Sequence, residues 1–231
     1  MDSSPDDLAT LLSAFARELQ RQSSPPQVLE TIVRNALELV PGCDEGSISL
    51  VVARRRVESQ AASSSLPRDV DALQEEVGQG PCLSAVFEQQ TVLVADMASE
   101  TRWPDFSRRA SERGVGGMLS FQLFVEGDNL GALNLYARSA GSFDEVSERT
   151  GLMFAAHAAV AYSAAQRESA LERALASRQL VGQAQGILME RHRLTAGDAF
   201  ARLTAISQAR NVKLHEVARR LVETGDLPAT G

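Results

Sequence analysis

The hydrophobic and polar positions of residues 178–222 follow a helical period in three short runs. In the first run an apolar stripe is expected from Leu180, Ala184 and Ile187, with Leu188 at its edge. The opposite side holds a second set: Gly182, Gln185, Gly186, Met189 and Arg193. Glycine costs a helix interior about 1 kcal/mol relative to alanine. This outward face therefore predicts close approach of another helix, of a nucleic acid or of a dimer partner.

Two further helices are expected after this run. Thr195 and Asp198 are spaced like a capping box, and Asn211 is a reasonable end for the helix they begin. A third helix is expected from Lys213 to about Glu223. The apolar sides are Phe200, Leu203 and Ile206 in the second helix and Leu214, Val217, Ala218 and Leu221 in the third. Three amphipathic helices of this length can close one small core.

The preceding part of the chain mixes helical and alternating patterns. Strands are expected near residues 47–52, 57–62, 92–96, 117–125 and 130–137, with antiparallel pairings. Helices are expected over residues 6–22, from there to about Val40, from Pro81 and from Pro104. Ser142 and Glu145 are expected to cap a long final helix. The pattern predicts an α+β fold, an antiparallel sheet with helices at both ends.

No proline interrupts the chain from Asp144 to about His192, so the final helix is expected to run straight into the first of the three short helices. Its apolar strip is rich in alanine and comprises Ala155, Ala156, Ala159, Val160, Ala164, Leu171, Ala174 and Leu175. Two interpretations remain open at this point. The helix lies along its own sheet, or it pairs with a second copy in a parallel coiled coil of a homodimer.

Charge divides the chain where the patterns do. Residues 167–231 hold ten Lys or Arg against seven Asp or Glu, whereas residues 1–166 hold thirteen against twenty-three, within a total net charge of −7. A basic end on an acidic chain is a hint of nucleic-acid binding. After Tyr162 the only aromatic residue is Phe200, which the pattern places on the core stripe. This argues against recognition by base stacking.

Composition excludes several classes. No stretch approaches the roughly 20 apolar residues of a membrane span, and the acidic start lacks the basic region of a signal peptide, so a cytoplasmic protein is expected. Cys43 and Cys82 offer no disulfide framework, and the three histidines show no metal-ligand spacing. We find no set of nucleophile, base and orienting residue. Hence no catalytic residue, metal or cofactor is expected, and the protein is not expected to be an enzyme.

The C-terminal pattern resembles a known family. The residues concerned are AxGILM at 184–189, AF at 199–200, Leu203, Ser207, Asn211 and KLxxVA at 213–218, and they resemble the ANTAR domain of bacterial antitermination regulators. The resemblance implies a dimer that grips tandem RNA hairpin loops in leader transcripts and prevents a terminator from forming. We expect RNA contacts from Gln185, Gly186, Met189, Arg191, Arg193, Ser207, Arg210, Asn211 and Lys213. The family often has lysine where this chain has Gln185, and a basic residue where it has Thr204.

The N-terminal part resembles a GAF domain in its order of elements, in GQGPC at 78–82 and in NLYA at 134–137. The resemblance implies a sensor with a pocket between the sheet and its cover, here residues 66–113, for an unidentified small molecule. The side chains available to line it are Phe87, Trp103, Phe106, Phe121 and Cys82. Cys82 is expected to be a buried structural cysteine, although its place at a helix N-terminus, which stabilises a thiolate, leaves a redox-sensing role as the alternative. The alternative for the aromatic residues is that they belong to the core.

The expected domains are an N-terminal helix and linker (1–24), a GAF-like sensor (25–165), a helical connector (144–178) that overlaps it, an ANTAR domain (179–225) and a tail (226–231). A sensor that changes the register or splay of a dimeric coil would alter the spacing of two RNA-binding bundles. One rival is a sensor that acts through protein contacts alone. The other is a DNA-binding helix-turn-helix, whose third helix would present His215, Glu216, Arg219, Arg220 and Glu223. Two acids make that face a poor reader of the major groove.

Overall fold

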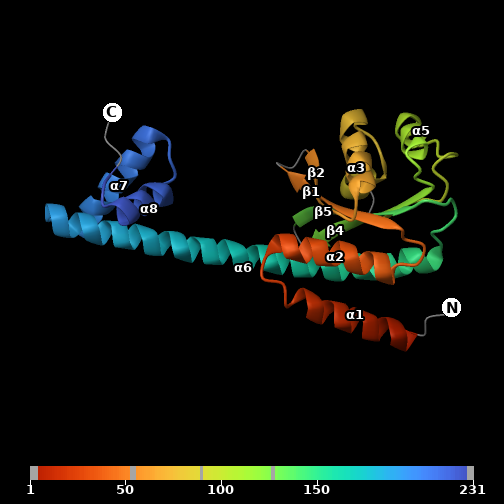
Figure 1. Ribbon diagram of the computed structural model, residues 1–231, viewed down its shortest axis with the longest axis horizontal. Helices are drawn as coiled ribbons and strands as arrows, with labels where there is room; N and C mark the ends of the chain where they lie inside the picture. The colour runs from red at the N-terminus through yellow and green to blue at the C-terminus, as the bar shows by residue number, and fades with distance from the viewer. Residues whose placement is uncertain (1–4, 53–55, 89–90, 126–127, 228–231) are drawn as a thin grey trace. The chain divides into compact units, whose positions relative to one another are not determined.

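The computed structural model describes residues 5–52, 56–88, 91–125 and 128–227 (Figure 1). The ends of the expected terminal segments, residues 1–4 and 228–231, lie outside the described residues. The chain forms two compact units, Met1–Gln166 and Arg167–Gly231. The helix α6 (Glu145–His192) is continuous and contributes to both units, as the absence of proline predicted.

The first unit is built on one antiparallel sheet. Its strands are β1 (Glu45–Val52), β2 (Arg56–Ala62), β3 (Thr91–Val94), β4 (Gly117–Val125) and β5 (Asp128–Ala137). They lie in the order β2-β1-β5-β4-β3, and every pair is antiparallel. The predicted α+β class and strand positions are confirmed. The two strands that precede β3 and the two that follow it therefore meet in the centre of the sheet, at β1 and β5.

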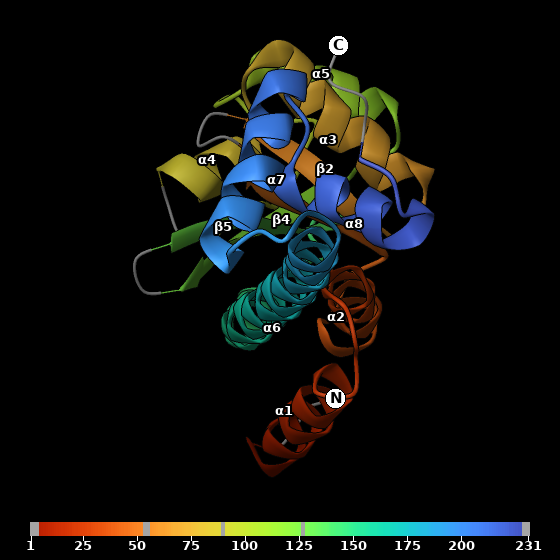
Figure 2. The same cartoon turned by 90° about the vertical axis from the view of Figure 1, so that its left-hand side faces the viewer.

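Helices cover both faces of this sheet. They are α2 (Pro25–Leu39), α3 (Ser65–Val77), α4 (Pro81–Phe87), α5 (Pro104–Glu112) and the first part of α6, while α1 (Pro5–Leu19) packs against α2 and, through Phe15 on Phe154, against α6. Figures 1 and 2 show α2 and α6 side by side on one face and α3, α4 and α5 on the other. Proline occupies the first turn of α2, α4 and α5, where it costs no backbone hydrogen bond.

Strand alternation sorts the side chains between the two layers. Ile48, Leu119 and Leu133 point to the α2 and α6 side, and the neighbouring Met118, Ala132 and Tyr136 point to the α3 side. Helix α6 crosses β4 so closely that a Cβ on Gly151 would lie 2.3 Å from the ring of Phe121. Close packing against the sheet therefore requires glycine at this helical position.

The start of α6 differs from the sequence prediction. The cap is Asp144, whose Oδ1 accepts from the backbone N–H groups of Val146 and Ser147 at 2.9 Å, and the Ser147 hydroxyl accepts from the N–H of Asp144. Ser142 instead donates to the carbonyl of Ser139. These contacts hold the pKa of the Asp144 carboxyl below its usual range, chiefly through its hydrogen bonds with Ser147. The capping box is thus shifted by two residues from the expected Ser142.

The alanine-rich strip of α6 is also divided between two environments. Ala155 and Ala159 are buried in the core beneath the sheet. Val160 is 64% exposed, Leu171 61% and Leu175 55%. The expectation of one continuous strip is wrong, because a helix that lies on its own sheet can present only its outer side to another molecule. The inner side of the strip therefore lies along the chain's own sheet, and pairing of the outer side with a second copy stays a prediction.

The second unit consists of the end of α6, α7 (Ala196–Arg210) and α8 (Leu214–Thr224). Thr195 caps α7 as predicted: its Oγ1 accepts from the N–H of Asp198 at 3.2 Å and donates to the Asp198 carboxylate at 2.7 Å. Asn211 ends α7 with φ of 51°, the left-handed conformation that asparagine tolerates best after glycine. The three predicted helices are therefore present with the predicted ends.

Candidate functional site

The core of the second unit is closed by small side chains. Ala184 of α6, Ala199 of α7 and Ala218 of α8 are each fully buried, together with Leu188 and Leu203. Small residues at a crossing let helix axes approach closely. The sequence prediction for α7 is wrong in one place: Phe200 is 44% exposed, and Ala199 takes the core position expected for it. An aromatic side chain therefore lies on the surface of this unit.

The residues opposite the core form what we call the glycine face: Gly182, Gln185, Gly186 and Met189 of α6. Apart from the adjoining backbone of α6 itself, no atom of the described chain lies within 4 Å of a Cβ built on Gly182 or on Gly186. Packing within the second unit therefore does not explain these two glycines. The face reaches the start of α7, since the amide of Gln185 donates to the carbonyl of Ala196 at 3.1 Å. Phe200 lies one helical turn beyond Ala196, on the same side of α7.

Of the other expected RNA contacts, Arg193 and Lys213 are exposed, at the end of α6 and at the N-cap of α8. Arg193 has φ of 54°, a left-handed conformation that costs an ordinary side chain about 1–2 kcal/mol. Its guanidinium therefore projects from a turn where glycine would be the unstrained choice.

Three of the expected residues have structural partners. The Arg191 guanidinium donates to the carbonyl of Gly225 at the end of α8, and the Ser207 hydroxyl donates to the carbonyl of Val212 at 2.6 Å. Asn211 donates its backbone N–H within the turn that ends α7. Arg210 is exposed and engaged in an interaction of its own. Arg191 thus links the end of α6 to the end of α8, and the bonds of Ser207 and Asn211 close the turn that ends α7.

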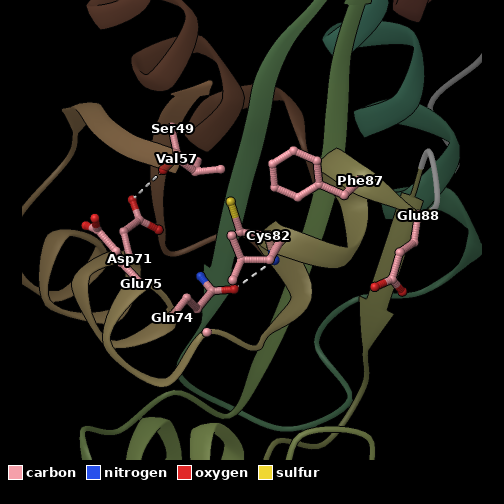
Figure 3. Close-up of a pocket in the computed structure, with 10 residues that line it drawn as sticks. Ser49, Val57, Asp71, Gln74, Glu75, Cys82, Phe87 and Glu88 are labelled. Atoms are coloured by element: carbon pink, nitrogen blue, oxygen red, sulfur yellow. Dashed lines mark hydrogen bonds between the residues drawn. The ribbon is translucent and has the colours of Figure 1, made fainter. Parts of the chain in front are cut away.

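The first unit contains a pocket of about 330 Å³ on the α3 and α4 side of the sheet (Figure 3). The described residues that line it are Ser49, Val57, Asp71, Gln74, Glu75, Gly78, Cys82, Leu83, Phe87 and Glu88. Cys82 and Phe87 line it as predicted. Trp103, Phe106 and Phe121 do not: Phe106 and Phe121 are fully buried, Phe121 on the opposite face of the sheet, and Trp103 stacks beneath Arg102. Phe106 and Trp103 pack on the pocket side of the sheet but within the core between α3 and α5, whereas Phe121 joins the core on the other face.

A buried carboxylate forms one wall of the pocket. Asp71 of α3 accepts from the Tyr136 hydroxyl at 2.6 Å, from the Ser49 hydroxyl at 3.0 Å and from the Asn134 amide at 3.3 Å. Ser120 donates to Asn134 Oδ1 at 2.9 Å and so turns the amide nitrogen toward Asp71. Burial raises the pKa of the Asp71 carboxyl, although its hydrogen bonds act in the opposite direction. Strands β1, β4 and β5 thus direct a polar network at one acid.

The sequence reasoning missed Asp71. The available signal was the alternation of polar residues in the strands, with Ser47 and Ser49 in β1, Ser120 in β4 and Asn134 in β5. In register, Asn134 lies between Ser47 and Ser120. Such alternation is usually a solvated face, whereas here all of these side chains are buried.

Gln74 lines the pocket and contacts Gly80 and Cys82 of the GQGPC segment. Its Oε1 accepts from the N–H of Cys82 at 2.8 Å, and its Nε2 is buried without a hydrogen-bond partner among the described residues. A Cβ on Gly80, which has φ of 144°, would lie 2.4 Å from Gln74 Oε1. An unsatisfied buried donor costs about 1–3 kcal/mol. Because a Cβ at position 80 would clash with the Gln74 amide, glycine is required there for Gln74 to lie against α4.

Cys82 is a buried thiol. It is 2% exposed, and burial, with the charge of Asp71 as a smaller cause, raises its pKa to about 12. The helix N-terminus does not offset this loss of solvation. The structure therefore favours the buried structural interpretation over the redox one. Within the described ranges, no three His, Cys, Asp or Glu side chains are grouped to hold a metal ion, and no helix is long and apolar enough to cross a membrane.

Comparison with protein family models gives one match for each of the two units. A GAF domain model matches residues 22–163, and an ANTAR domain model matches residues 169–222. The molecule is thus a regulator that joins a GAF domain to an ANTAR domain. The GAF match covers more than half of the chain, so the chain belongs to the GAF domain family. The comparison with curated proteins gave no match.

Solved structures agree with this fold. The GAF domain of a phosphoenolpyruvate-protein phosphotransferase from Coxiella burnetii is 18% identical, with a TM-score of 0.56, over 73% of this chain and 99% of that one. Free methionine-R-sulfoxide reductase from Neisseria meningitidis, solved with its substrate, is 18% identical with a TM-score of 0.56, over 72% and 96%. A bacteriophytochrome from R. palustris is 11% identical with a TM-score of 0.62, over 90% of this chain and 47% of that one. At these identities the likeness is one of fold.

Proposed function

We propose that this protein is a non-enzymatic, cytoplasmic antitermination regulator whose ANTAR domain binds hairpin loops in nascent leader RNA under the control of its GAF domain. The observation that supports RNA binding is the glycine face. Gly182 and Gly186 leave α6 open where no other part of the described chain approaches it, and the exposed Arg193 follows directly after the end of the same helix. A helix surface without side chains lets a phosphate backbone or a base come close to the polypeptide.

Phe200 extends this surface. The sequence argument against base stacking placed Phe200 in the core, but its ring is exposed and lies one turn from the carbonyl that binds Gln185. Aromatic stacking on an unpaired base contributes about 1–3 kcal/mol. The surface thus offers an aromatic ring, an amide and a guanidinium to the unpaired bases and phosphates of an RNA loop.

A homodimer would present two such surfaces. The exposed side of α6 carries Val160, Leu171 and Leu175, which are among the most exposed large apolar residues described. We propose that this side pairs with a second copy in a parallel coil up to Leu175, which ends before the glycine face begins at Gly182 on the same side of α6. Leu171→Arg is expected to make the protein a monomer in analytical ultracentrifugation, whereas Ala176→Arg, on another side of α6, should leave the dimer intact. If the protein without any substitution sedimented as a monomer, the proposal of a homodimer would be contradicted.

A binding assay with three RNAs tests the function. The expected order of affinity is tandem hairpins, then a single hairpin, then a random duplex, and Leu171→Arg should remove the preference for two hairpins over one. The slope of log affinity against log salt should increase by about 0.7 for each neutralised single-strand phosphate. Equal affinity for all three RNAs would reject the proposal. The exposed Met189 and Phe200 would then favour docking of a protein partner.

A further inference from the structure

The charged side chains among the described residues that line the pocket of the first unit are all acidic. Asp71, Glu75 and Glu88 are among its lining residues, and no described lining residue is basic. Acidic walls around a partly enclosed space concentrate a negative potential there. This composition favours a positively charged occupant and disfavours an anion.

A second, independent feature of the pocket is the buried amide of Gln74. Gln74 is 2% exposed, and its Nε2 has no hydrogen-bond partner among the described residues. Its Oε1 is held by the N–H of Cys82, so the amide cannot turn over to satisfy its nitrogen elsewhere. Figure 3 shows this nitrogen facing the space between Asp71 and Cys82. An occupant that satisfies Gln74 must carry a hydrogen-bond acceptor.

The rim of the pocket supplies an aromatic ring. Phe87 lies at the end of α4 and is 51% exposed, next to Glu88. Exposure of a ring costs hydrophobic stabilisation, and its face attracts a cation. Phe87 and the acids therefore select for the same kind of ligand.

We propose that the pocket binds a small organic cation, an amine or a quaternary ammonium compound, that also carries an oxygen acceptor. The cationic group lies between the acids and the ring of Phe87, and the oxygen accepts from Gln74 Nε2. A volume of about 330 Å³ is at the lower end of the range for ligand pockets, which restricts the ligand to a small metabolite. This inference rests on the proposed role of the first unit as a sensor.

Three probes of nearly the same shape test the charge requirement on the full chain without RNA. They are choline, the neutral 3,3-dimethylbutan-1-ol and the anionic 3,3-dimethylbutanoate. Calorimetric titration should give choline an affinity at least about tenfold above that of the alcohol, since ion pairing and cation–π attraction are lost in the alcohol. The anion should not bind. Equal binding of the alcohol, preferential binding of the anion, or no binding of choline at millimolar concentration would each overturn the proposal.

Variants locate the binding. Phe87→Leu should weaken choline binding about threefold, because it removes the ring and keeps an apolar side chain. Phe124→Leu is the matched control, since Phe124 is also 51% exposed but does not line the pocket. Glu88→Gln should weaken binding in the same way with an unchanged unfolding temperature. Choline binding that is insensitive to both Phe87→Leu and Glu88→Gln would place it outside this pocket.

The choline titration and the RNA assay test two different proposals, so either proposal can be rejected while the other stands. Choline binding is measured without RNA, so a protein that binds choline in the pocket but prefers no RNA retains this inference and loses the antitermination function. A protein that prefers tandem hairpins and does not bind choline retains the function and loses this inference.

Discussion

Helix α6 contains one glycine in each unit for which the structure gives opposite accounts. In the first unit, a Cβ on Gly151 would lie 2.3 Å from the ring of Phe121, so the sheet itself requires glycine. In the second unit, nothing in the described chain apart from the adjoining backbone of α6 lies within 4 Å of a Cβ on Gly186. Both positions bear the same helical penalty of about 1 kcal/mol. The comparison shows that a glycine can be explained by its own fold or only by a contact with another molecule.

The largest expected effect is on the first of these glycines. Gly151→Ala should lower the free energy of unfolding of the first unit by about 1–3 kcal/mol, because overpacking against Phe121 outweighs the gain in helix propensity. Denaturant unfolding followed by the fluorescence of Trp103 measures it. Gly186→Ala is the matched control and should raise stability by up to about 1 kcal/mol. If both variants changed the free energy of unfolding in the same direction, the two glycines would not differ in the way that the structure indicates.

The second expected effect concerns RNA. Gly186→Leu should lower affinity for tandem hairpins about tenfold, because a branched side chain fills the glycine face, while the apolar stripe on the other side of α6 remains intact. Gel-shift titration measures the loss, and circular dichroism checks that the helices persist. Ala176→Leu, an exposed change off the glycine face, should bind RNA normally. Undiminished affinity of Gly186→Leu would mean that RNA does not approach α6 at this face.

A smaller effect is expected at the end of α6. Arg193→Gly should raise stability by about 1 kcal/mol, since glycine adopts the left-handed conformation without strain. The same change should weaken RNA binding and reduce the salt slope by about 0.7, the contribution of one phosphate. Thermal unfolding and salt-dependent titration separate the two results. A variant that is less stable than the parent would show that Arg193 makes a structural contact instead.

The smallest expected effect is at Cys82. Its pKa of about 12 means that the folded protein holds a neutral thiol at pH 7 and at pH 9, whereas a free cysteine is half ionised near pH 8.5. Iodoacetamide should therefore leave Cys82 unmodified in the native protein across this range. Mass spectrometry after brief exposure measures the modification, with guanidinium-unfolded protein as the reactive control. Fast native alkylation would restore the redox interpretation and show that the first unit opens readily.

The sequence predictions that succeeded are those that depend on residues close together in the chain, and the core and pocket predictions that failed depend on packing between distant segments. The cap at Thr195, the helix end at Asn211 and the proline-led helices were confirmed, because each depends on residues within one turn. The positions of the strands were predicted correctly from the alternation of apolar and polar residues. Pocket residues were predicted only in part: Cys82 and Phe87 line the pocket, but Phe106 does not. An aromatic residue near a glycine-rich loop fits a core and a pocket equally well on pattern alone.

Phe200 illustrates the limit of pattern analysis. Its spacing with Leu203 and Ile206 fits a core stripe, but the neighbouring Ala199 permits a closer helix crossing and takes the buried position. Which of two adjacent residues enters a core depends on the volume that the other helices leave. That volume is a property of the assembled unit.

The sequence by itself determined the local elements, the cap at Thr195, the continuity of α6 and the basic character of residues 167–231, because these depend on neighbouring residues and on composition. The tertiary structure alone decided that the polar sides of β1, β4 and β5 are buried around Asp71, and that only the outer side of α6 is free. The physical reason is that burial depends on what packs against a face. An alternating strand or an amphipathic helix specifies that it has two faces, and the packing of distant segments decides what each face meets.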